Sequence, residues 1–157
     1  MRIPRPVAAS IDGLLMVLGT IWVVFLAEGD FFSQFQGFLI TLGVPVAAWC
    51  GIVLADLLLR RRDYAEADLY DPRGRYGAVP PVPMALLALG TVLGWGLVTN
   101  GYAGWLTWQG YLLEPLGLGG REGAWAFANL GVLVALVVGF AGAWALRRGA
   151  VRFQEVG

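Results

Sequence analysis

Histidine and lysine are absent from this chain of 157 residues, and cysteine occurs once, as Cys50. Without histidine, the sequence lacks the commonest zinc ligand and the side chain that titrates near neutral pH. A single cysteine excludes an intramolecular disulfide and a cysteine-based metal cluster, so Cys50, within an apolar run, is interpreted as a buried thiol. With no nucleophile beside a base and no paired carboxylates, we expect neither an enzyme nor a bound cofactor or metal.

Charged residues are also scarce, at 14% of the chain, against about 25% in soluble proteins. Apolar residues make up 58% and gather in four long runs, at about 7–27, 35–59, 82–102 and 124–146. Each run has roughly the 20 residues that a helix needs to cross a hydrocarbon core of about 30 Å. Lipid offers no partner to backbone N–H and C=O groups, so helices are the plausible spanning structure. We predict an all-α membrane protein in which residues 1–157 form one transmembrane domain with four helices in a lipid bilayer.

The basic residues indicate how these helices are oriented. By the positive-inside rule, the side of a membrane that carries most arginines and lysines is the cytoplasmic one. Only Arg121 lies on one side of the four-helix arrangement, and the other ten arginines fall on the opposite side: Arg2, Arg5, Arg60, Arg61, Arg62, Arg73, Arg75, Arg147, Arg148 and Arg152. We therefore predict a multi-pass protein of the plasma membrane, with both termini and the loop 60–81 cytoplasmic. Since sidedness explains the arginines, they give no indication of nucleic-acid binding.

Small residues recur along one face of three runs. They are Gly43, Ala47, Gly51 and Ala55 in the second run, Gly90 and Gly94 in the third, and Ala124, Ala128, Gly131, Ala135, Gly139 and Gly142 in the fourth. Small residues let helix backbones approach closely in lipid. We expect these faces to pack among the four helices, in a homo-oligomer, or against helices outside this chain.

One proline and two carboxylates inside the apolar runs are candidates for a structural or functional role. Pro45 removes one backbone hydrogen bond, so it predicts a bend that is either a hinge in a gate helix or a static kink. Asp12 and Asp56 are the only carboxylates in the runs. An intramembrane acid is a functional candidate, but both lie near predicted cytoplasmic ends. There, water or an ion pair, such as Asp56 with Arg60, would stabilise the charge.

The second run and the loop after it carry a recognisable motif, GVPVAAWCGIVLADLLLRRRDYAEADLYDPRGRYG at residues 43–77. This motif resembles the nucleobase:cation symporter-1 family, in particular the bacterial cytosine/purine permeases. The resemblance rests on Ala55-Asp56-Leu57, Leu69-Tyr70 and Gly74-Arg75-Tyr76-Gly77, with the arginines and tyrosine between them. The cytoplasmic motif is therefore Asp56, Arg60, Arg61, Arg62, Tyr64, Tyr70, Gly74 and Tyr76.

The rest of the chain is similar to the same family. IPRPVAASIDGLLMVLGT looks like the start of its ninth helix, and GWGLVTN and GLGGREGAWAFANLGVLVALVVGF look like its last two helices. The resemblance implies that the four predicted helices correspond to the last four of a twelve-helix, inverted-repeat transporter. Such a transporter would import cytosine or a related purine or pyrimidine nucleobase with a cation, either sodium or protons.

The family's principal nucleobase and sodium contacts lie on helices that have no counterpart here. Alternating access requires one bundle to move against another around an enclosed site, so we expect no transport by this chain alone. The missing N-terminal helices would be its partner. By placement in the family fold, four residues of the second run are candidates for a substrate gate: Phe35, Phe38, Leu39 and Leu42.

A second interpretation comes from a different class of protein. The chain would then be a free-standing four-helix membrane scaffold or accessory subunit, possessing a complete and sided four-span topology of its own. The match to interior segments of a transporter and the small-residue faces count against this alternative.

Overall fold

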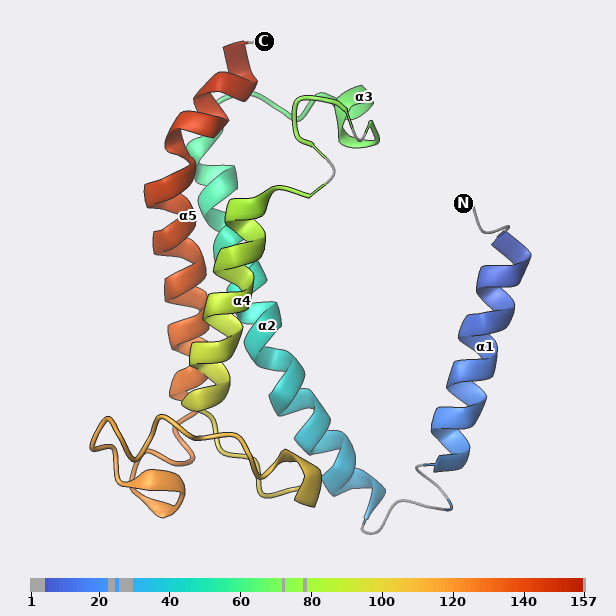
Figure 1. Cartoon of the computed structure of the whole chain (residues 1–157), viewed down its shortest axis with the longest axis vertical. Coiled ribbons are helices and arrows are strands. Elements are labelled where there is room, and N and C mark those ends of the chain that lie inside the picture. Colours follow the sequence, from blue (N-terminus) through green and yellow to red (C-terminus); the bar gives the residue numbers. More distant parts are fainter. Residues whose placement is uncertain (1–4, 23–24, 26–29, 72, 78, 157) are drawn as a thin grey trace.

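The computed structural model describes residues 5–22, 25, 30–71, 73–77 and 79–156. Within these ranges the chain is all-helical, which confirms the all-α part of the prediction, and it contains five α-helices where the sequence predicts four. They are α1 Arg5–Ile21, α2 Phe31–Leu59, α3 Glu66–Leu69, α4 Pro81–Gly96 and α5 Leu130–Val156 (Figure 1). Two 3-10 turns, η2 Gly104–Leu106 and η3 Gly120–Glu122, lie in the long connection between α4 and α5.

Two helices in the described part of the chain are long and apolar enough to cross a membrane, Phe31–Leu59 and Leu130–Glu155. Two other apolar helices, Ala9–Ile21 and Pro81–Gly96, are shorter. The 16 residues of α4 extend about 24 Å, less than a hydrocarbon core of about 30 Å. Length and composition thus support membrane association, whereas four crossings with cytoplasmic termini stay a prediction.

Helices α2, α4 and α5 pack against one another as a three-helix bundle (Figure 1). A Cβ added at Gly51 of α2 would lie 2.2 Å from the carbonyl oxygen of Leu136 in α5. A Cβ at Gly131 of α5 would lie 2.0 Å from the carbonyl oxygen of Gly94 in α4. These separations are shorter than any side chain tolerates, so glycine is required where the backbones cross. The predicted close packing through small residues is confirmed at these positions.

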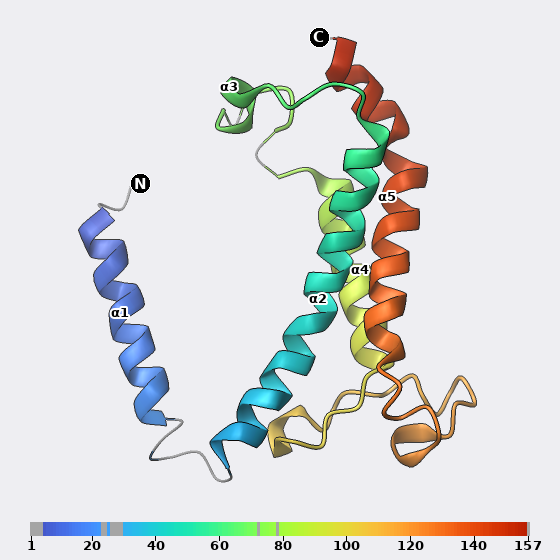
Figure 2. The same ribbon diagram turned by 180° about the vertical axis from the view of Figure 1, so that it is seen from behind.

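Helix α1 stands apart from this bundle, as both views show (Figure 1 and Figure 2). Its side chains are exposed wherever the structure describes them, including Leu14 at 60% and Met16 at 74%. The sequence predicts a helix over residues 7–27, whereas α1 ends at Ile21. Residues 23–24 and 26–27 of the predicted helix lie outside the described residues. The sequence predicts that this helix lies in a membrane, where lipid or other helices would surround such a surface.

Helix α4 ends earlier than the sequence predicts. The third apolar run predicts a helix to residue 102, but α4 ends at Gly96. Its last carbonyls accept hydrogen bonds from the following connection: Gly110 N–H donates to Trp95 O (2.9 Å), and Leu112 N–H donates to Gly96 O (2.8 Å). Because these bonds satisfy the terminal carbonyl groups, the helix can end inside an apolar stretch.

Helices α2 and α5 also have different bounds from those expected. The second run predicts a helix from residue 35, and α2 already begins at Phe31. The fourth run predicts residues 124–146, whereas α5 covers Leu130–Val156. Asn129, just before α5, has a φ of 51°, which an α-helix does not accommodate. At the other end, the polar residues beyond 146 stay helical because they contact the loop after α2, as described next.

Candidate functional site

The most strongly connected part of the predicted motif lies where α2 ends beside the C-terminal half of α5. Asp56, in the last turn of α2, is 5% exposed. Its carboxylate accepts a hydrogen bond from Arg60 Nε at 2.6 Å and forms a second ion pair with Arg147 of α5. The predicted pairing of Asp56 with Arg60 is confirmed. This buried carboxylate joins α2 to α5 and leaves a positive balance at this end of the bundle.

Two tyrosines of the motif complete the cluster around Arg60. Tyr64 donates its hydroxyl hydrogen to the carboxylate of Asp56, and the Arg60 guanidinium lies 4.3 Å from the Tyr64 ring centroid. The same guanidinium lies 5.2 Å from the ring of Tyr76, whose hydroxyl accepts the N–H of Ala65 at 3.0 Å. Cation–π contacts of this kind stabilise a desolvated guanidinium. The spacing of the motif therefore has a structural reason, since its residues converge on one buried charge pair.

The environment of Tyr64 keeps its phenol protonated. Burial raises the pKa of Tyr64 above its ordinary value, and the hydrogen bond to Asp56 raises it further, while the nearby guanidinium of Arg60 acts in the opposite direction. A phenol with a raised pKa remains a hydrogen-bond donor throughout the physiological range. Tyr64 is therefore a positioning residue for the carboxylate of Asp56, and no proton transfer is implied.

The end of α5 holds the two following arginines through their backbone. Glu155 Oε1 accepts the N–H of Arg61 at 2.5 Å and the N–H of Arg62 at 3.1 Å. Arg60 also reaches α5, because its Nη2 donates to Gln154 Oε1 at 2.8 Å. These bonds explain why α5 continues well past the predicted end at residue 146.

The remaining motif residues lie in the loop and do not join the cluster. Gly74 N–H donates to Asp71 O at 2.9 Å, which closes a turn in the loop, and Pro72 lies outside the described residues. A Cβ at Gly74 would lie 2.7 Å from the carbonyl oxygen of Asp68, so this position requires glycine. Tyr70 is 89% exposed and takes no part in the Asp56 network.

The gate candidates lie at the opposite end of α2, before Pro45. Their exposed fractions are 45% for Phe35, 48% for Phe38, 48% for Leu39 and 43% for Leu42. This first half of α2 leans away from α4 and α5 (Figure 2). The structure does not bring these four residues to the Asp56 cluster, and a role in gating stays a prediction.

The bend at Pro45 is held by a neighbouring helix. Proline has no N–H, so the carbonyl oxygen four residues earlier, on Thr41, loses its partner within the helix. The indole N–H of Trp95 in α4 donates to this oxygen at 2.9 Å. Because the freed carbonyl group is satisfied by α4, the structure favours a fixed bend over a free hinge.

A small polar network surrounds the same turn of α2. Asn100 Nδ2 donates to Gly37 O at 2.8 Å, and Gln109 Nε2 donates to Thr41 Oγ1 at 2.8 Å. Asn100 and Gln109 are 4% and 1% exposed. Gln109 Oε1 has no hydrogen-bond partner among the described residues. These side chains anchor the connection after α4 to α2. Hydrophobic periodicity in the sequence does not predict these contacts.

Trp95→Phe is expected to lower the free energy of unfolding by about 1–3 kcal/mol, because it leaves the part-buried Thr41 carbonyl group without its hydrogen bond. The measurement is unfolding by sodium dodecyl sulfate, followed by circular dichroism. The control is Trp49→Phe, since Trp49 is 58% exposed on α2. Equal losses for both variants would contradict a specific role for the indole N–H.

Sequence reasoning missed several residues of the site. Arg147 was assigned only to membrane sidedness, and Gln154 and Glu155 fell outside the predicted helix. One signal was available: a single long helix with Arg147 and Glu155 at its polar end could reach the loop that carries the other arginines. Trp95 had no such signal, since its role depends on the register between α4 and Pro45.

Among the described residues, no group of three or more Cys, Asp or Glu side chains is placed to hold a metal ion. Comparison with protein-family models, curated proteins and solved structures gave no match to this chain. The residues of the site form a structural junction between α2 and α5 at an arginine-rich helix end.

Proposed function

We propose that this chain forms the C-terminal part of a secondary transporter that imports cytosine or a related nucleobase with a cation. The observation that carries the proposal is the convergence of the family-like motif: Asp56, Arg60, Tyr64 and Tyr76 lie in one buried network. A motif that resembles the permeases along the sequence thus also acts as one unit in space, at the junction between a long apolar helix and its following loop.

Two exposed surfaces support a larger assembly. Helix α1 has exposed apolar residues. Among the described residues, α2, α4 and α5 pack closely on one another, and α1 packs closely on none of them. The first half of α2 exposes Phe31 at 61% and Phe32 at 68%, besides the gate candidates. Helices of a transporter repeat would cover such surfaces. With only the last four helices present, the chain alone lacks an enclosed substrate site and is not transport-competent.

The test is a split-transporter experiment. Vesicles containing the chain alone are expected to take up no more radiolabelled cytosine than protein-free vesicles. The chain is then co-expressed with a bacterial cytosine permease that has been truncated after its eighth helix. This combination is expected to show saturable uptake. The control is the eight-helix part alone. Saturable uptake by the chain alone would contradict the incomplete-transporter proposal, and so would a lack of both co-purification and uptake with the eight helices.

One observation favours a second candidate, a free-standing membrane scaffold or accessory subunit. Within the chain, the ion pair of Asp56 with Arg147 joins α2 to α5, and α4 packs against both helices. This candidate would be supported if the purified chain is folded, forms homo-oligomers and does not bind the eight-helix part of the permease.

A further inference from the structure

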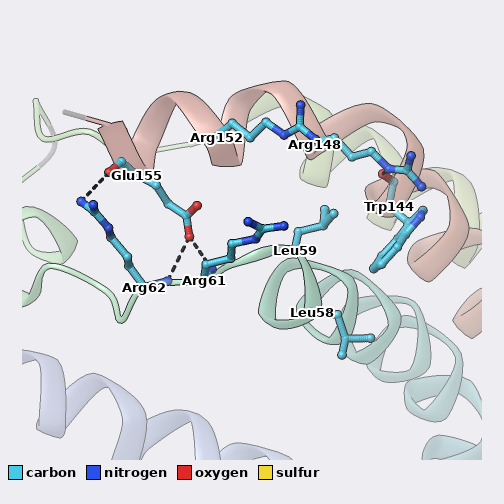
Figure 3. Close-up of a pocket in the computed structure, with 8 residues that line it drawn as sticks. All are labelled: Leu58, Leu59, Arg61, Arg62, Trp144, Arg148, Arg152 and Glu155. Carbon is cyan, nitrogen blue, oxygen red and sulfur yellow. Dashed lines mark hydrogen bonds between the residues drawn. The ribbon is translucent and has the colours of Figure 1, made fainter.

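A cavity of about 690 Å³ lies between the end of α2, the loop after it and the last turns of α5 (Figure 3). This volume is within the range of about 300–1,000 Å³ that is usual for ligand pockets. Its lining residues are Leu58, Leu59, Arg61, Arg62, Trp144, Arg148, Arg152 and Glu155. The cavity is separate from the Asp56 network, because neither Asp56 nor its two arginine partners line it.

Four arginines against one glutamate give the cavity a strongly positive lining. Arg61 comes from the loop, while Arg148 and Arg152 come from successive turns of α5 (Figure 3). Among the described residues, the guanidinium groups of Arg61 and Arg152 have neither a hydrogen-bond partner nor an ion-pair partner. Unpaired guanidinium groups that share a cavity repel one another, and an anion between them would relieve the repulsion.

The remaining charged groups are already held in place. Glu155 uses Oε1 to accept the N–H groups of Arg61 and Arg62, and Arg62 Nη1 donates to Glu155 O at 3.0 Å. The Arg148 guanidinium lies 5.1 Å from the Trp144 ring, and its Nε donates to Trp144 O at 3.1 Å. These contacts fix the loop and one guanidinium before any ligand binds, which is the preorganisation that strengthens binding.

One wall of the cavity is apolar. Leu58 and Leu59 belong to the last turn of α2, and Leu58 is 64% exposed. Trp144 adds an indole, a side chain that is enriched at membrane interfaces. The cavity therefore changes from apolar to cationic across the end of two helices that are long and apolar enough to span a membrane. A small soluble anion would contact only the arginines. A lipid would contact both surfaces, with its headgroup on the arginines and its acyl chain on the apolar wall.

We propose that this cavity binds the phosphate headgroup of an anionic phospholipid. The phosphate lies among Arg61, Arg148 and Arg152, and the first part of an acyl chain packs on Leu58 and Trp144. Guanidinium groups bind phosphate through paired, charge-assisted hydrogen bonds, and basic pockets beside transmembrane helices recognise anionic headgroups. The site holds whether the chain is part of a transporter or free-standing.

The test compares lipids in native mass spectrometry of the full chain. Dioleoyl phosphatidylglycerol is expected to bind with at least about tenfold higher affinity than dioleoyl phosphatidylcholine, and high salt is expected to reduce this preference. Arg61→Gln with Arg152→Gln is expected to abolish most of the preference. This double variant removes two guanidinium groups that have no partner among the described residues, so it breaks no described contact. The matched control, Arg73→Gln with Arg121→Gln, removes two charges away from the cavity.

Three outcomes would overturn the proposal. The first is equal affinity of the unaltered chain for the two lipids, a result that does not depend on the folding of any variant. The second is an equal loss in the matched control, which would indicate attraction by net charge alone. The third is binding of glycerol 1-phosphate or inorganic phosphate as tightly as the lipid, which would assign the cavity to a soluble phosphate. Circular dichroism of each variant establishes that its helices are formed.

Discussion

Asp56→Asn is expected to lower the free energy of unfolding by about 3–5 kcal/mol, the usual cost of removing one partner from a buried ion pair. The Asp56 side chain is 7% exposed, and those of its partners Arg60 and Arg147 are 7% and 13% exposed. The substitution keeps the size of the side chain but leaves both guanidinium groups without a counter-charge. Sodium dodecyl sulfate titration of the purified chain, followed by circular dichroism, measures the effect.

The control for this prediction is another arginine–aspartate ion pair that is more exposed to solvent. Arg75 and Asp68 form an ion pair in the loop, with side chains 36% and 30% exposed. Asp68→Asn is expected to cost no more than about 1 kcal/mol, because water and salt screen such a pair. If the two aspartate variants lost similar stability, burial would not explain the importance of Asp56.

Gly51→Leu is expected to separate α2 from α5 and to cost about 3 kcal/mol or more, at or beyond the upper end of overpacking effects. The nearest atoms to a Cβ at Gly51 are backbone atoms, the carbonyl oxygen of Leu136 at 2.2 Å and the amide nitrogen of Phe140 at 2.8 Å. Backbone cannot turn aside as a flexible side chain can, so the helices have to move apart. The same titration measures the loss.

Gly43→Leu is the matched control, because it makes the same substitution on the same helix. A Cβ at Gly43 meets no atom within 4 Å in the described part of the chain. This variant is expected to stay within about 1 kcal/mol of the unaltered chain, since leucine has a better helix propensity than glycine. A Gly43 variant as unstable as the Gly51 variant would mean that α2 is crowded on a face that the structure leaves open.

Hydropathy and small-residue spacing predicted the helices and several of their contacts. Gly51, Gly94 and Gly131 belong to stripes visible in the sequence, and they lie where the backbones cross. The same pattern includes Gly43, where an added Cβ would meet no atom within 4 Å in the described residues. A stripe shows that close approach is sterically possible, but which turn of the helix is covered depends on how the helices cross.

The ends of the helices were the weakest part of the sequence prediction. An apolar run predicts a helix for as long as it lasts, yet α4 ends at Gly96 because Gly110 and Leu112 bond its last carbonyl groups. Conversely, α5 continues through polar residues because Glu155 holds the loop after α2. Both cases depend on contacts between distant segments, which a local pattern does not contain.

The candidate site was predictable in part for the same reason. The pairing of Asp56 with Arg60 is a local contact between positions one turn apart, and the sequence indicated it. The pairing with Arg147 requires α5 to lie beside α2 in one register. The cavity among Arg61, Arg148 and Arg152 also depends on that register.

Pro45 acts as a marker of alignment between two helices. Because proline has no N–H, the carbonyl oxygen of Thr41 has no hydrogen-bond donor within α2. The indole N–H of Trp95 in α4 supplies that donor. If α4 slid by one turn, about 5.4 Å along its axis, the Thr41 oxygen and the Trp95 indole would both lose this hydrogen bond. Pro45 weakens α2 on its own, but it therefore selects one axial position of α4 from the several that apolar packing alone would allow.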